Sequence, residues 1–133
     1  MREPPPLRQA LLRPLPAPLR ELLLLLQALP GTQGLYGLLI AFLVLLKVGL
    51  IGGEAVMVSA EAGAYIFCAC LPIAIVGLIS AISQGRTAAA GINIIVKRPE
   101  ELSKAMVYAA MVETYAVLAL LISFLMLNGI TVA

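Results

Sequence analysis

The chain has 133 residues, of which 62% are hydrophobic and only 12% are charged, and it contains neither His nor Trp. A soluble domain of this length needs far more charge to cover its surface, so the composition excludes an ordinary soluble globular protein. A chain without His cannot form a Ser-His-Asp triad, and the absence of a Walker-type glycine loop predicts that it binds no nucleotide. Because the formal net charge is only +2, we interpret the basic residues as topology signals and expect no nucleic-acid partner.

The first twenty residues differ from the rest of the chain. Six prolines between Pro4 and Pro18 disfavour a regular helix there, and four arginines disfavour a membrane span. The segment also lacks the uninterrupted apolar core of a signal peptide. We therefore predict that residues 1–20 form a disordered or surface-lying leader on the cytoplasmic side. Residues 21–133 are predicted to form a transmembrane domain.

Three stretches are apolar and long enough to cross a bilayer, which takes roughly 20 helical residues. They are about Leu22–Leu46, Ala64–Val96 and Ala105–Leu127. Basic residues cluster in the connection 97–104, and acidic residues occupy the connection 49–63. The positive-inside rule then places the connection 97–104 in the cytoplasm and the connection 49–63 outside. The sequence predicts an all-α membrane protein whose long helices form antiparallel hairpins.

Two features interrupt the apolar helices. Pro30 lacks a backbone donor and clashes with the preceding turn, so we expect a helix distortion that frees a carbonyl near Leu29. Small residues are dense between Gly85 and Gly91. Such a run lets helix backbones approach closely, either within one subunit or against copies of the same chain.

Glu113 is the acidic residue that lies deepest in a predicted span. A carboxylate at the centre of a membrane helix costs roughly 2.5–3.5 kcal/mol on insertion scales, so it must be protonated, paired or bound to a cation. Gln84 and Glu113 are equally far from the turn between Arg98 and Pro99. Antiparallel neighbours would therefore hold these two side chains at the same depth. The alternative is an inert, hydrogen-bonded acid.

One helical face of the first span carries Leu29, Thr32, Gln33 and Tyr36, which are spaced i, i+3, i+4 and i+7. Their oxygens, together with those of Gln84 and Glu113, exceed what a proton needs and favour Na⁺, because hard cations prefer oxygen shells. A hydroxyl on the same face would orient the carboxylate. The alternative is a network that only holds helices together. The predicted ion-binding residues are Glu113, Gln84, Gln33, Thr32 and the carbonyl of Leu29, with Tyr36 in support.

Four segments occur in a characteristic order: LPGTQGLYG at 29–37, QGRTAAAG at 84–91, KRPE at 97–100 and MVETYA at 111–116. Through them the chain resembles the rotor proteolipid (subunit K, the c-type subunit) of bacterial V-type Na⁺- or H⁺-translocating ATPases, over about Gln27–Asn128. The resemblance implies a ring of identical subunits in a bacterial plasma membrane. The ring would turn against a stator subunit that carries an arginine and would be attached to a central stalk.

The resemblance also implies a non-catalytic, multi-pass subunit that carries Na⁺, or alternatively H⁺, on the carboxylate of Glu113. ATP would be hydrolysed or made on other subunits. The family has four helices in two hairpins, and its glycine-rich first helix has no counterpart in this sequence. We expect that helix to be encoded just upstream, in another frame or before a mis-set start. The alternatives are a truncated proteolipid without its first helix and a non-rotary oligomeric channel or carrier that uses the same acid.

Overall fold

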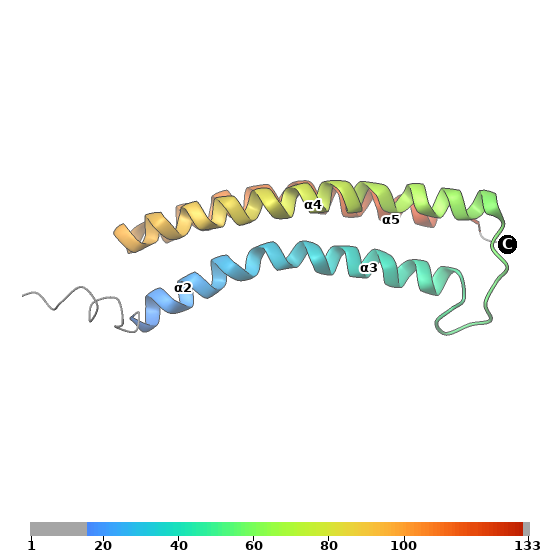
Figure 1. The fold of residues 1–133 in the computed structure, drawn as a ribbon, viewed down its shortest axis with the longest axis horizontal. Coiled ribbons are helices and arrows are strands. Elements are labelled where there is room, and N and C mark those ends of the chain that lie inside the picture. Colours follow the sequence, from blue (N-terminus) through green and yellow to red (C-terminus); the bar gives the residue numbers. More distant parts are fainter. Residues whose placement is uncertain (1–15, 132–133) are drawn as a thin grey trace, which may run out of the picture.

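The computed structural model describes residues 16–131, and within that range every regular element is a helix (Figure 1). The predicted all-α class is therefore confirmed. Three helical stretches are long and apolar enough to cross a membrane: Leu19–Lys47, Ala60–Lys97 and Pro99–Asn128. The elements are α2 (Ala17–Ala28), η1 (Leu29–Gly31), α3 (Thr32–Lys47), α4 (Ala60–Lys97), η2 (Pro99–Glu101) and α5 (Leu102–Asn128).

Helix α2 begins earlier than the sequence suggests. Residues 17–20, which we assigned to the leader, form its first turn. Pro16 is the N-cap, and Pro18 lies in the first turn, where a missing backbone N–H removes no bond within the helix. These prolines therefore begin the helix instead of preventing it. Residues 1–15 of the predicted leader lie outside the described part of the chain.

The distortion expected at Pro30 is the short 3₁₀ helix η1, which joins α2 to α3. Figure 1 shows α2 and α3 as one long, curved helical path. The 3₁₀ turn accommodates the missing donor of Pro30, because the backbone N–H of Thr32 bonds to the carbonyl of Leu29 three residues back. The carbonyl predicted to be free therefore has a partner within its own turn.

Helices α4 and α5 form an antiparallel hairpin and make the most extensive contact in the fold. Small side chains allow this close approach. A Cβ added at Gly91 would lie 2.9 Å from the Cβ of Ala105, which is closer than side chains pack. Ala88 is buried in the same interface, whereas Ala89 and Ala90 are exposed. Part of the small-residue run therefore packs within the subunit, as one of our two alternatives proposed.

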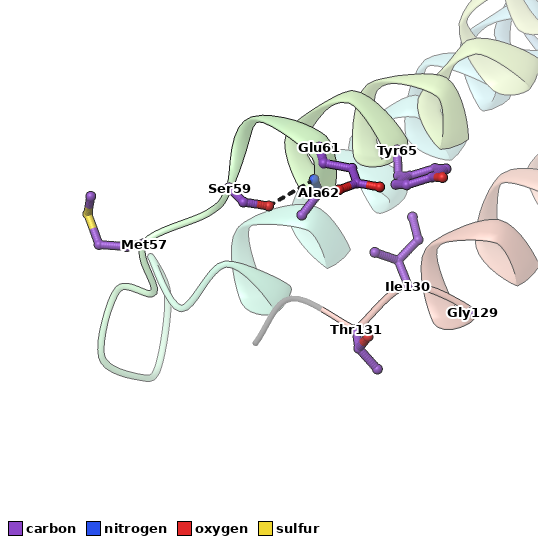
Figure 2. Close-up of a pocket in the computed structure, with 8 residues that line it drawn as sticks. All are labelled: Met57, Ser59, Glu61, Ala62, Tyr65, Gly129, Ile130 and Thr131. Carbon is purple, nitrogen blue, oxygen red and sulfur yellow. Dashed lines mark hydrogen bonds between the residues drawn. The ribbon is translucent and has the colours of Figure 1, made fainter.

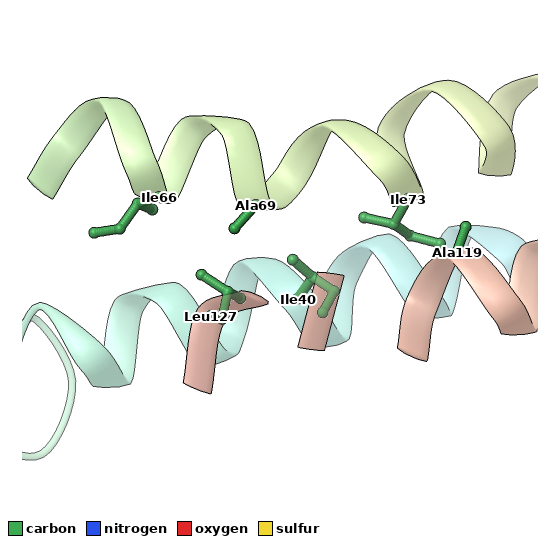
Figure 3. Packing of buried hydrophobic residues seen from close by; sticks show 6 residues of the cluster. All are labelled: Ile40, Ile66, Ala69, Ile73, Ala119 and Leu127. Atoms are coloured by element: carbon green, nitrogen blue, oxygen red, sulfur yellow. The ribbon is translucent and has the colours of Figure 1, made fainter. Parts of the chain in front are cut away.

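Two apolar clusters lie at different levels of the helices. Figure 3 shows the first cluster, in which residues of α3, α4 and α5 meet. It contains Ile40, Ile66, Ala69, Ile73, Ala119 and Leu127. The second cluster contains Leu26, Ala88, Ile95, Ala105 and Ala109. On each of the three helical paths, polar side chains lie between the two clusters. We call these side chains the polar layer, and apolar packing encloses it on both sides.

The connection 48–59 and the C-terminal end of α5 lie at one end of the bundle, and the turn at Arg98 lies at the other (Figure 1). Gly49 has φ +73°, and a Cβ there would collide with the carbonyl of Glu54, so the turn requires glycine. The side chain of Ser59 caps α4 by accepting a hydrogen bond from the N–H of Ala62 at 3.2 Å.

Candidate functional site

Glu113 lies half-buried on α5, within the polar layer. Tyr36 Oη donates a hydrogen bond to its Oε1 at 2.6 Å, and Gln84 Nε2 donates one to its Oε2 at 3.3 Å. In residues 16–131 the ion pair is that between Lys104 and Glu101, so Glu113 has no cationic partner there. The carboxylate is therefore held by neutral donors only.

Gln84, on α4, is fully buried and forms hydrogen bonds with both α3 and α5. Its Nε2 also donates to the backbone carbonyl of Ala109 at 3.0 Å, and its Oε1 accepts a hydrogen bond from Gln33 Nε2 at 2.9 Å. Both partners of Nε2 are acceptors without a proton, so the direction of the Gln84 amide is determined by its surroundings. The second lone pair of Oε1 has no hydrogen bond.

Gln33 is only 5% exposed, and its two ends differ. Its Nε2 donates to Gln84 Oε1 and to Ser80 Oγ, the latter at 3.1 Å. Its Oε1 is the one buried side-chain N or O atom without a hydrogen-bond partner in the described part of the chain. Such an acceptor costs about 1–3 kcal/mol when it stays unpaired, and a cation would satisfy it.

Thr32 and Leu29 supply further oxygens at the η1 turn. Thr32 Oγ1 donates to the Leu29 carbonyl at 2.7 Å, which leaves the lone pairs of the hydroxyl available. The 3₁₀ turn at Pro30 thus places a backbone carbonyl and a hydroxyl side by side, directly before Gln33 in the chain.

Of the residues that we predicted from the sequence, the structure joins four in one hydrogen-bond network: Glu113, Gln84, Gln33 and Tyr36. Thr32 and Leu29 are bonded to each other in the η1 turn. The equal depth of Gln84 and Glu113 is confirmed by their hydrogen bond, and Tyr36 orients the carboxylate as expected. Gln33 belongs to the same network through Gln84. One detail differs from a simple ligand shell, because Gln84 presents its nitrogen to the carboxylate and its oxygen to Gln33.

Sequence analysis missed Ser80. This side chain is 5% exposed, accepts the hydrogen bond from Gln33 and donates one to the carbonyl of Val112 at 2.9 Å. The only indication in the sequence was its position, four residues before Gln84 and hence on the same face of α4.

The chemistry of the donors suits a monovalent cation. Among the described residues no three His, Cys, Asp or Glu side chains converge as a metal cluster would require. The layer instead contains one carboxylate and several neutral oxygens. One negative charge neutralises one positive charge, which matters where apolar packing excludes water. Amide, hydroxyl and carbonyl oxygens are ligands that hard cations prefer.

Two hollows differ in their relation to this layer. A shallow one beside Glu113 is lined by apolar and hydroxyl side chains of α5 alone, including Ala110, Thr114 and Val117. A pocket of about 400 Å³ lies at the end of the bundle where α4 begins and α5 ends, and there Glu61 and Tyr65 face Ile130 (Figure 2). The larger pocket is therefore remote from the polar layer, and we assign it no part in the site.

Comparisons with known proteins show which proteins this chain is similar to. Residues 67–126, which include Ser80, Gln84 and Glu113, match the model of the ATP synthase C-subunit family. The chain is 52% identical over 103 residues to the V-type sodium ATPase subunit K of Enterococcus hirae, covering 77% of this chain and 62% of that protein. It is 39% identical over 104 residues to the A-type ATP synthase subunit K of Methanocaldococcus jannaschii, covering 78% and 42%. The chain thus spans less than two thirds of the length of these relatives.

Proposed function

We propose that this chain is an ion-carrying component of the membrane rotor of a V-type ATPase, and the match of residues 67–126 to the model of the ATP synthase C-subunit family supports this. The proposed ion is Na⁺, with H⁺ as the alternative. The name of the Enterococcus relative, a V-type sodium ATPase subunit, supports Na⁺. We place the protein in a bacterial plasma membrane, in a ring of identical subunits.

One observation carries this proposal. A lone carboxylate without a cationic partner among residues 16–131 is joined, through Gln84, to the side-chain nitrogen of Gln33, and the buried oxygen of the same amide has no hydrogen bond in that range. A network that only held helices together would leave neither of these groups in need of a cation. A protonated acid would need only Tyr36 and would leave the Gln33 oxygen unsatisfied. A Na⁺ ion satisfies both.

Lone-pair accounting indicates how the residues would hold Na⁺. The carboxylate of Glu113 accepts two hydrogen bonds and has further lone pairs for the ion. Gln33 Oε1 is free, and Gln84 Oε1 has one lone pair left. Thr32 Oγ1 donates its proton to Leu29 and would face the ion with its oxygen. The Leu29 carbonyl would join when the Thr32 hydroxyl turns its proton away.

The bound ion would make Glu113 electrically neutral. An ionised carboxylate at the centre of a bilayer costs roughly 2.5–3.5 kcal/mol on insertion scales, and that cost opposes movement of a bare site past lipid. A stator arginine, expected from the family, would release the ion by pairing with the carboxylate. Moving one ion requires about 2.3 kcal/mol for each 100 mV of membrane potential, which other subunits would supply from ATP.

Carbodiimide labelling tests the proposal. The reagent modifies protonated carboxyl groups, so we expect it to label Glu113 and Na⁺ to protect this residue by keeping the carboxylate ionised and coordinated. Peptide mapping by mass spectrometry, with and without Na⁺, measures both effects. Glu61 and Glu100 lie near the helix ends and are the internal controls. Label on those residues instead would refute the site, and label on Glu113 that ignores Na⁺ but falls with rising pH would identify H⁺ as the ion.

A further inference from the structure

Ser80 lies where three helices meet, and neither the sequence analysis nor the comparisons assign it a role. It belongs to α4 and is almost completely buried. Its Oγ accepts a hydrogen bond from Gln33 on α3 and donates one to the carbonyl of Val112, the residue before Glu113 on α5. A single hydroxyl therefore connects the helix that bears the free amide oxygen to the helix that bears the carboxylate.

The direction of each of these bonds follows from the available protons. The carbonyl of Val112 can only accept, so it takes the one proton of the Ser80 hydroxyl. Ser80 can then only accept from Gln33, which must present its NH₂ group. Gln84 imposes the same choice, because its own NH₂ is directed to the Ala109 carbonyl and to Glu113, which leaves its oxygen to face Gln33.

Both hydrogens of the Gln33 amide are thus held against α4, and its oxygen points elsewhere. The oxygen and nitrogen of an amide are nearly equal in size, so hydrogen-bond partners rather than packing decide which end points where. Without Ser80, Gln33 would keep one anchor instead of two. Its amide could then turn, and its oxygen would no longer be directed to one place.

We infer that Ser80 is a positioning residue of the ion site: its hydroxyl, held by the carbonyl of Val112, directs the oxygen of Gln33 toward the cation. This inference rests on the proposed function, since it assumes that Na⁺ binds beside Glu113. Since the proton of Ser80 and one of its two lone pairs are engaged with Val112 and Gln33, we assign it the positioning of Gln33 and not direct coordination. Its loss should weaken Na⁺ binding without changing the labelling of the carboxylate when Na⁺ is absent.

The test measures the Na⁺ concentration that half-protects Glu113 from carbodiimide in the purified full-length protein. Ser80→Ala should raise this concentration about tenfold, as expected for loss of one buried hydrogen bond, and labelling without Na⁺ should stay unchanged. Ser80→Thr keeps the hydroxyl and should restore most of the affinity. Ser123→Ala is the matched control, because Ser123 is also a buried serine between α4 and α5. It accepts a hydrogen bond from the N–H of Ile73, a residue of the first apolar cluster, outside the polar layer.

A double-mutant cycle shows whether Ser80 acts through Gln33. In a Gln33→Leu background, Ser80→Ala should change the half-protecting Na⁺ concentration by less than about twofold, because the amide to be positioned is gone. An unchanged Ser80→Ala variant would overturn the inference, as would equal losses in both backgrounds or an equal loss in Ser123→Ala. A wild-type protein that Na⁺ does not protect would instead refute Na⁺ as the ion, and the inference with it; if its labelling also did not fall with rising pH, the proposed function would be refuted as well.

Discussion

Replacing Tyr36 with Phe isolates the shortest hydrogen bond to the candidate carboxylate. The substitution removes one hydroxyl and keeps the ring, so the packing of α3 against α5 is retained. The lost bond, 2.6 Å from Tyr36 Oη to Glu113 Oε1, is a short bond to an ionisable group. Bonds of this kind contribute about 1.5–3 kcal/mol. Because Tyr36 is only half-buried, the lower limit applies, which corresponds to about a tenfold change in an equilibrium constant.

We therefore expect Tyr36→Phe to raise the Na⁺ concentration that half-protects Glu113 from carbodiimide by about tenfold. The carboxylate would lose the donor that fixes its orientation and would have to be ordered when the ion binds. The assay is mass-spectrometric quantification of labelled Glu113 across a Na⁺ titration. Tyr115→Phe is the matched control, since Tyr115 lies two residues from Glu113, is 64% exposed and makes no side-chain hydrogen bond among the described residues.

Equal half-protecting concentrations in Tyr36→Phe and wild type would refute this reasoning, because the hydrogen bond would then contribute nothing to ion binding. Equal losses in Tyr36→Phe and Tyr115→Phe would refute it in another way. They would mean that any phenol removed near α5 perturbs the site. The expected pattern is a loss in the first variant alone, with Glu61 and Glu100 unlabelled in both proteins.

Two other substitutions test the oxygen shell and the helix packing. Thr32→Val should raise the Na⁺ concentration that half-protects Glu113 by about tenfold, since it removes a proposed ligand oxygen while keeping the side-chain shape. Thr87→Val, which removes an exposed hydroxyl bonded to its own helix, should have no effect. Gly91→Val should destabilise the fold by about 1–3 kcal/mol, because its Cβ would press against Ala105, and thermal unfolding of the purified protein should show partial rescue by Ala105→Gly.

The depth of the polar residues could be predicted from the sequence because helix geometry is regular. Gln84 and Glu113 are equally far from a short turn, and the constant rise of two antiparallel helices places them at one level. The ends of the helices were predicted less well. Hydropathy omits polar residues in terminal turns, so the predicted span from Ala64 starts four residues after α4 does, and the helical Ala17 fell within the predicted leader.

The role of Ser80 could not be predicted, because a serine in an apolar helix usually bonds to its own backbone. Ser83, one turn further along α4, does this by donating to the carbonyl of Ile79 at 2.9 Å. Ser80 instead donates to Val112 on another helix. The difference depends on which face of α4 meets α5, and that information exists only in the packed structure. The orientation of the Gln84 amide was hidden for the same reason, since the Ala109 carbonyl determines it.

Burial divides the polar layer into a rigid part and a reachable part. Gln33, Ser80 and Gln84 are enclosed by the three helices, whereas Glu113 borders the hollow on the outer side of α5. An ion bound as proposed would reach the carboxylate from this hollow, and the amide groups behind it would not need to move. Whatever molecule covers the outer side of α5 at that level would control how fast a bound ion exchanges. The exchange rate would thus depend on the outer side of α5, and the affinity on the buried side chains of α3 and α4.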